Sequence, residues 1–115
     1  MLHPPLTLHA EPLTAAGRRR LTLSGELDYG TAPFARQAVT AAQADARELV
    51  IDVSGVEKAD VFGLAVLLKA WHAGPANGCR IRVVKASTAV RGAWQAVRPL
   101  QPLGRLASPS RVRAA

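Results

Sequence analysis

The chain alternates short apolar runs with stretches in which apolar residues recur every three or four positions. Residues 20–24 alternate apolar and polar side chains, which predicts a strand with one buried face. Residues 6–9 alternate in the same way, and the turn signal at 15–17 between them predicts an N-terminal antiparallel hairpin. Residues 49–53 form an apolar, β-branched run, which predicts a central strand covered on both faces. Residues 25–28 and 54–56 are expected to lead the chain out of these strands.

Two helical segments are predicted on either side of the central strand. The first runs from Pro33 to Ala44, with the Thr31 hydroxyl as its cap and proline in the first turn. One face of this helix is expected to carry Phe34, Ala38 and Ala41 or Ala42. The second helix begins after Asp60, a good N-cap residue, and its apolar side chains recur at helical spacing. These side chains are Leu64, Leu67, Leu68 and Trp71.

A further strand and a third helix are predicted after the second helix. Glycine and proline at 74–78 turn the chain, and residues 80–85 favour a strand. Ser87 is placed to cap a helix that ends before Pro99, and an optional short strand is expected near Leu106. The apolar face of this helix is predicted to carry Val90, Trp94 and Val97.

This order of elements predicts a single α/β domain. Its mixed β-sheet should contain the N-terminal antiparallel hairpin and be packed by about three to four helices. The 115 residues are enough for one domain and too few for two. The domain is expected to span residues 1–107, with a flexible C-terminal tail at 108–115.

The charge balance is basic, but its distribution argues against specific nucleic-acid binding. Fifteen Lys and Arg against eight Asp and Glu give a net charge of +7. The arginines are scattered apart from the run at 18–20, and aromatic residues for base stacking are scarce. Weak attraction to an acidic partner surface is the expected consequence. No apolar run is long enough to insert into a membrane, and the N-terminus lacks signal-peptide features, so the expected location is cytoplasmic.

Few residues have the spacing that catalysis or metal binding requires. The single cysteine, Cys79, excludes an internal disulfide and is expected to be buried. Asp52 and Asp60 could form an acid–base pair, but no activated nucleophile or glycine-rich phosphate loop accompanies them. Turn and cap roles therefore explain both residues, and neither an enzyme nor a cofactor is predicted. The histidines, none of which has a partner at metal-ligand spacing, are His3, His9 and His72.

The first turn of the second helix contains two large apolar residues, Val61 and Phe62. Two interpretations stay open from the sequence. Phe62 could fold back onto the core as a staple-like contact. Alternatively, the pair could belong to a docking surface at the end of the strand.

Several segments in this order resemble a known family: residues 23–28 (LSGELD), 31–33 (TAP) and 49–56 (LVIDVSGV), followed by Asp60, Gly63-Leu64 and Leu67-Leu68. Together they are similar to STAS domains, and in particular to bacterial anti-sigma factor antagonists. The resemblance covers about residues 6–106. It implies a regulator that binds an anti-sigma factor, usually an ATP-dependent serine kinase, and thereby frees a sigma factor for transcription. It also leaves a homodimer possible. The residues that it assigns to partner binding are Asp28, Asp60, Val61, Phe62, Gly63 and Leu64.

The sequence departs from the family at its regulatory serine. Family members carry a phosphorylated serine directly after the loop aspartate, and here Val61 follows Asp60. The resemblance therefore implies a domain without the usual phosphoswitch. Either the surface stays binding-competent, or Phe62 is too bulky for a kinase and the domain serves another partner or a scaffold role. Turn and cap roles sufficiently explain the nearby hydroxyls of Ser54 and Ser87.

Three other functions compete with this one. A STAS-like subunit of a lipid- or anion-transport complex would dock the same fold on a membrane-associated ATPase. A small enzyme would use Asp52 and Asp60. A basic nucleic-acid-binding domain would show a steep dependence of DNA association on salt.

Overall fold

The structure is a computed structural model in which residues 5–97 are described. The chain begins with two strands, which are followed by a helix, a long strand and a second helix. In chain order the elements are β1 (Leu6–Ala10), β2 (Arg18–Leu27), α1 (Ala32–Gln43), β3 (Glu48–Ala59), α2 (Val61–Ala73), the 3-10 helix η1 (Pro75–Asn77), β4 (Arg80–Val84) and α3 (Thr88–Val97). The strand predicted near Leu106, the tail predicted at 108–115 and His3 lie outside the described residues.

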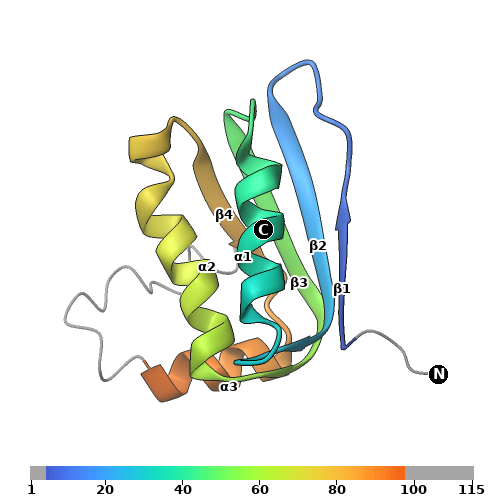
Figure 1. The fold of residues 1–115 in the computed structure, drawn as a ribbon, viewed down its shortest axis with the longest axis vertical. Coiled ribbons are helices and arrows are strands. Elements are labelled where there is room, and N and C mark those ends of the chain that lie inside the picture. Colours follow the sequence, from blue (N-terminus) through green and yellow to red (C-terminus); the bar gives the residue numbers. More distant parts are fainter. Residues whose placement is uncertain (1–4, 98–115) are drawn as a thin grey trace.

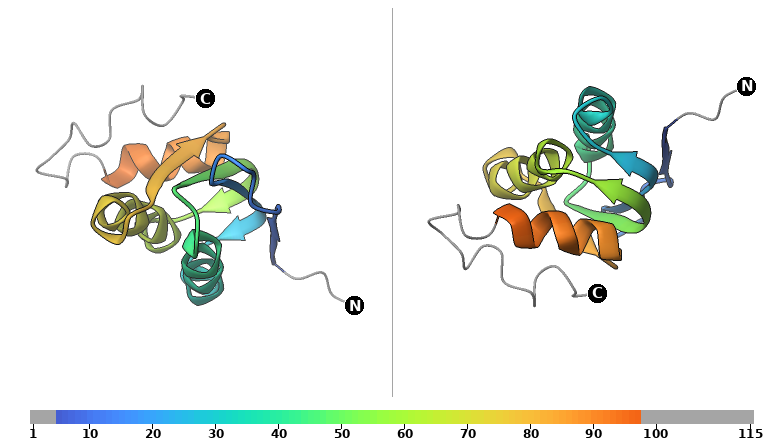
Figure 2. Two further views of the ribbon diagram at one scale, coloured as in Figure 1. Left: turned by 90° about the horizontal axis from the view of Figure 1, so that it is seen from above. Right: turned by 90° about the horizontal axis from the view of Figure 1, so that it is seen from below.

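The four strands form one mixed sheet in the order β1-β2-β3-β4. β1 and β2 pair antiparallel as the predicted hairpin, whereas β2–β3 and β3–β4 are parallel. Helices α1 and α2 lie against one side of the sheet (Figure 2), and α3 crosses the end at which β2 and β3 finish (Figure 1). The predicted fold class is confirmed, with three α-helices among residues 5–97.

The core lies between the sheet and the helices. Alternate residues of β2 and β3, including Leu21, Leu23 and Ile51, have almost no exposed surface because they face the helical layer. The side chains that α1 turns toward them are small: Ala32, Ala35, Val39 and Ala42. Small side chains on the inner face let this helix approach the sheet closely.

Both central strands are longer than the sequence predicted. Segments 25–28 and 54–56 were expected to turn away, but β2 continues to Leu27 and β3 to Ala59. The two extensions pair with each other, with Gly25 opposite Val56. Gly25 sits beside a register shift with φ of +101°, and a Cβ there would collide with the carbonyl oxygen of Pro5. The glycine that indicated a turn is therefore a bulge inside a strand.

Helix α1 differs from its prediction in cap and in face. The Thr31 hydroxyl makes no cap hydrogen bond and instead donates to the carbonyl oxygen of Glu26 at 2.8 Å. Phe34 was placed with Ala38 on the predicted common face, but it is 59% exposed. Of the predicted face, Ala42 is buried and Ala38 packs against the core, so the prediction was wrong at Phe34. The other buried residues of this helix are Ala32, Ala35 and Val39.

The other two helices begin as predicted. An Asp60 carboxylate oxygen accepts a hydrogen bond from the Gly63 N–H at 2.9 Å, and Ser87 Oγ accepts one from the Val90 N–H at 3.2 Å. Leu64 and Leu67 are buried, and the predicted face of α3 is buried as well. Cys79 is also buried as expected, and burial, together with the charge of Glu48, raises the pKa of its thiol.

Asp52 is a buried carboxylate in the middle of β3. One oxygen accepts a hydrogen bond from Arg20 Nη2 at 2.5 Å, and the other accepts from the Ser54 N–H at 2.9 Å and the Ser54 hydroxyl at 2.8 Å. Burial alone would raise the pKa of Asp52, but these donors and the Arg20 charge bring it below its ordinary value.

This lowered pKa predicts a loss of stability in acid. The unfolded chain binds a proton at Asp52 more readily, so the stabilisation is present above the ordinary aspartate pKa of about 4 and is lost as the pH falls below it. Urea denaturation between neutral pH and the acid range should show a flatter pH dependence for Asp52→Asn than for the unmodified chain. Asp45→Asn, at an exposed position, should keep the original slope. An unchanged slope in Asp52→Asn would contradict this assignment.

Candidate functional site

The N-terminus of α2 and the turn between β2 and α1 are joined by one carboxylate, that of Asp60. One oxygen accepts from the Gly63 N–H, as the helix cap, and the other accepts from the Tyr29 N–H at 3.1 Å. The Asp60 N–H in turn donates to the Leu27 carbonyl oxygen at 3.2 Å. Both segments follow strands that end at the same edge of the sheet (Figure 1), so two loops far apart in sequence form one structural unit.

The turn at residues 28–31 is closed by its own side chains. The Asp28 N–H donates to Thr31 Oγ1 at 3.0 Å, and the Thr31 N–H donates to an Asp28 carboxylate oxygen at 3.1 Å. Thr31 is 3% exposed and its hydroxyl also bonds to β2. These bonds fix the turn at both ends, so it presents Tyr29 from a rigid base.

Three large apolar side chains lie exposed on this unit, and we call Tyr29, Val61 and Phe62 the apolar patch. Tyr29 is 72% exposed, Phe62 56% and Val61 39%. The two rings meet edge to face, with centroids 5.2 Å apart and planes at 74°. Phe62 does not fold back onto the core, so the staple-like contact is not formed, and the docking role of the pair stays a prediction.

The six residues predicted to bind a partner take three different positions. Val61 and Phe62 are exposed, Asp28 and Asp60 are half-buried and hold the two loops, and Leu64 is buried in the core. Gly63 is also buried, because α2 passes so close to the start of the β2–α1 turn that a Cβ there would collide with the Leu27 carbonyl oxygen and the Asp28 nitrogen. The glycine therefore permits the approach on which the patch depends.

Tyr29 was missed as a site residue by sequence reasoning. It directly follows the segment at 23–28 that carries the family resemblance, and an aromatic residue in a polar turn was the available signal. Its contact with Phe62 depends on the parallel pairing of β2 with β3, which spacing along the chain does not reveal.

The structure does not bring the two aspartates of the enzyme hypothesis together. Asp52 lies opposite Thr22 and Val84 within the sheet and binds Arg20 and Ser54, whereas Asp60 follows the end of β3. Within residues 5–97, no group of three or more His, Cys, Asp or Glu side chains is arranged to hold a metal ion. None of the described helices is long and apolar enough to cross a membrane.

Comparison with known proteins places this geometry in a family. Residues 13–98 match the family model described as Mlab, STAS domain. A crystal structure of an anti-sigma factor antagonist from Mycobacterium paratuberculosis is 30% identical, with 88% of each chain covered and a TM-score of 0.62. Among curated proteins, none matches the chain.

Two further solved structures share the fold. The anti-sigma factor antagonist STAS domain from Rhodobacter sphaeroides is 23% identical, with 73% of this chain and 94% of that chain covered and a TM-score of 0.60, which shows the fold alone. The murine Solute Carrier 26 family member A9 anion transporter is 26% identical, with a TM-score of 0.57. That match covers 67% of this chain and 13% of the transporter.

The close approach at Gly63 predicts that a single methyl group disrupts the site. In Gly63→Ala, the clash with the Leu27 carbonyl should outweigh the better helix propensity of alanine and lower the free energy of unfolding by about 1–3 kcal/mol. Gly92→Ala is the matched control, because nothing lies within 4 Å of its added Cβ. That variant should gain about 0.5–1 kcal/mol, as expected for glycine replacement within a helix. Chemical denaturation measures both, and equal effects would refute the packing role of Gly63.

Proposed function

The chain belongs to the STAS domain family, and from this membership we propose that it is an anti-sigma factor antagonist that binds a kinase-type anti-sigma factor. By occupying the anti-sigma factor, it would free a sigma factor and so control transcription in the bacterial cytoplasm. The protein acts by binding and not by catalysis. The observation that carries the proposal is the exposed apolar patch of Tyr29, Val61 and Phe62 on a rigid base.

The patch has the properties of a protein-binding anchor. Aromatic side chains are enriched at the energetic centres of interfaces because they bury a large area at a low cost in side-chain entropy. The ring contact between Tyr29 and Phe62 further limits the conformations of both side chains before a partner arrives. The Asp60 hydrogen bonds hold the backbone beneath them. A preorganised surface of this kind loses little conformational freedom on binding.

We further propose that this surface lacks the usual phosphoswitch. Val61, the first residue of α2, occupies the position after Asp60 that the family resemblance assigns to the phosphorylated serine. Valine has no hydroxyl to accept a phosphate. A phosphoserine would add a charge of about −2 to the patch, whereas valine keeps it uncharged whether or not ATP is present. The complex with the anti-sigma factor should therefore persist in ATP.

A second candidate function is supported by two of the comparisons. The family model is described as Mlab, and a murine anion transporter contains a similar domain. In that case, the same patch would dock on a subunit of a membrane-associated transport complex. The identity of the protein that binds through Phe62 separates the two functions: an ATP-binding cassette protein would support the transport role and contradict the anti-sigma role.

Replacement of Phe62 tests the docking role of the patch. Phe62→Ser should weaken binding of the purified cognate anti-sigma kinase by about tenfold or more, because loss of an interface anchor costs over 1.4 kcal/mol. Its melting temperature should change little, since the side chain is 56% exposed. Phe34→Ser is the matched control: it removes an aromatic ring of similar exposure, 59%, from α1. Calorimetric titration and thermal melting measure the two effects, and equal loss of binding in both variants would contradict the proposal.

Replacement of Val61 tests the missing switch. With the same kinase and ATP, Val61→Ser should gain one phosphate and then release the kinase, because the new negative charge opposes docking. The unmodified chain should gain no phosphate at position 61 and should remain bound. Intact-mass and peptide mass spectrometry locate the modification. Release of the unmodified chain by ATP would show that it is switched in some other way.

A further inference from the structure

The three described helices contain no acidic residue, although the chain has eight. All eight carboxylates lie in strands, in loops or at the Asp60 cap position. The charged side chains of the helices are basic: Arg36 in α1, Lys69 in α2 and Arg91 in α3, with His72 near the end of α2. Surfaces of soluble domains usually intersperse both signs of charge, so this separation gives the helical layer a positive outer surface.

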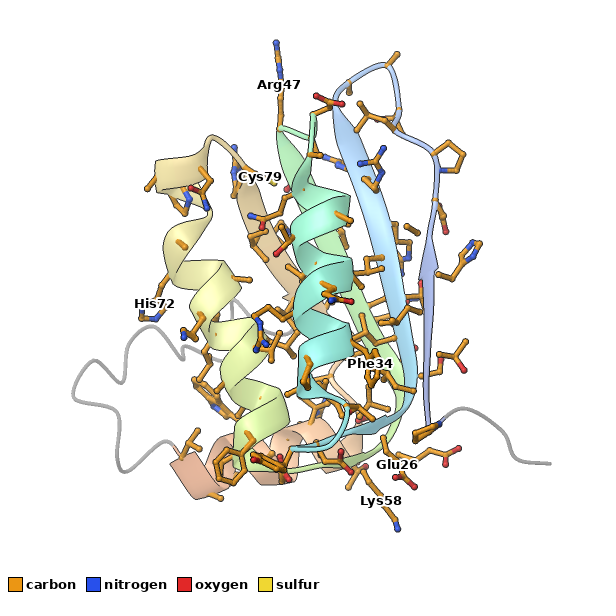
Figure 3. The ribbon with its side chains drawn as sticks, viewed as in Figure 1. Glu26, Phe34, Arg47, Lys58, His72 and Cys79 are labelled. Carbon is orange, nitrogen blue, oxygen red and sulfur yellow. The ribbon has the colours of Figure 1, made fainter. Side chains whose placement is uncertain are left out.

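The outer face of α2 extends from the apolar patch toward the end of the helix and carries both apolar and basic side chains. Side chains at helical spacing from Val61 and Phe62 form a shallow hollow lined by Ala65, Leu68, Lys69, His72 and Ala73. Lys69 and His72 are exposed, and Leu68 is half-buried. Figure 3 shows His72 pointing away from the sheet. We call these five residues together with the patch the α2 face.

A small apolar notch between α2 and α3 adjoins the α2 face. Leu68 lines both, and Trp71 and Trp94 lie in the notch with Arg91 beside them. Among residues 5–97, Arg18, Arg20 and Arg82 form ion pairs with Glu48 or Asp52. Lys69 and Arg91 form no ion pair with any residue in that range. Within the described part of the chain, no carboxylate neutralises the basic groups beside the α2 face.

We propose that the α2 face binds an acidic amphipathic helix of the partner protein, an inference that rests on the proposed function. The apolar side of that helix would cover the patch, Ala65 and Leu68, while its carboxylates would face Lys69, His72 and Arg91. The thirteen residues of α2 give a face about 20 Å long, which suits a partner helix of three to four turns. Charge complementarity would then set the orientation of the partner as well as its rate of association.

An anionic membrane fits the same face less well. Each basic residue near such a surface contributes only about 1 kcal/mol, and the α2 face offers one lysine, one histidine and the neighbouring Arg91. In addition, the Asp60 carboxylate is bonded directly beneath the aromatic side chains that would have to enter the lipid. A headgroup layer of negative charge would be repelled there.

Nuclear magnetic resonance can map this surface without the natural partner. The probe is a helical peptide of about four turns with leucines on one side and glutamates on the other. Its addition should shift the amide resonances of residues 61–73 and of Arg91, and a peptide with glutamine in place of glutamate should bind about tenfold more weakly. Shifts located elsewhere, or equal binding of both peptides, would overturn the proposal. Binding of vesicles rich in phosphatidylglycerol without binding of the acidic peptide would also overturn it.

Charge reversal then tests the natural complex. The double variant Lys69→Glu, Arg91→Glu should bind the anti-sigma kinase about tenfold more weakly at low salt, with a smaller difference at high salt. Arg47→Glu is the control and should leave the affinity unchanged, because Arg47 directly precedes β3, at the end of the sheet opposite to α3 and the start of α2 (Figures 1 and 3). If Phe62→Ser weakens the complex but the double variant does not, the proposed function stands and this inference fails. If the acidic peptide maps to α2 but the kinase does not bind, the proposed function fails instead.

Discussion

The Asp60 carboxylate is the contact on which the surface of this domain depends. One oxygen caps α2 by accepting from the Gly63 N–H, and the other holds the β2–α1 turn by accepting from the Tyr29 N–H. This arrangement requires β2 and β3 to end side by side, which their parallel pairing up to Leu27 and Ala59 ensures. It also requires the absence of a side chain at Gly63. Strand register, a capped helix and one glycine thus combine to place two aromatic rings in contact.

Much of the fold could be predicted because local signals agreed with tertiary packing. The hairpin, the central strand, the Asp60 and Ser87 caps and the buried face of α3 all follow from patterns within short stretches of the chain. The errors occurred where a local signal had two physical meanings. Gly25 is compatible with a turn or with a bulge, and only the pairing of β2 with β3 decides between them. The row of α1 that faces inward was likewise decided by fit to the sheet and not by the size of Phe34.

The candidate site was predictable in part for the same reason. Large apolar residues directly after a cap indicate a candidate site at Val61 and Phe62, but the sequence does not show that these side chains are exposed. Tyr29 belongs to the patch only because Phe62, 33 positions further along the chain, lies against its ring. Leu64 shows the converse case, since it lies near the patch in sequence but faces the core. Contacts between loops that follow different strands are set by topology, which spacing along the chain does not encode.

The hydrogen bonds beneath the patch have a consequence for how such a protein diversifies. The backbone amides of Tyr29 and Gly63 meet the Asp60 carboxylate, while the side chains of Tyr29, Val61 and Phe62 take part in none of these bonds. Most substitutions at these three positions would therefore leave the supporting framework intact. After gene duplication, two copies could acquire different binding partners through a few changes at these positions, without first evolving a new scaffold.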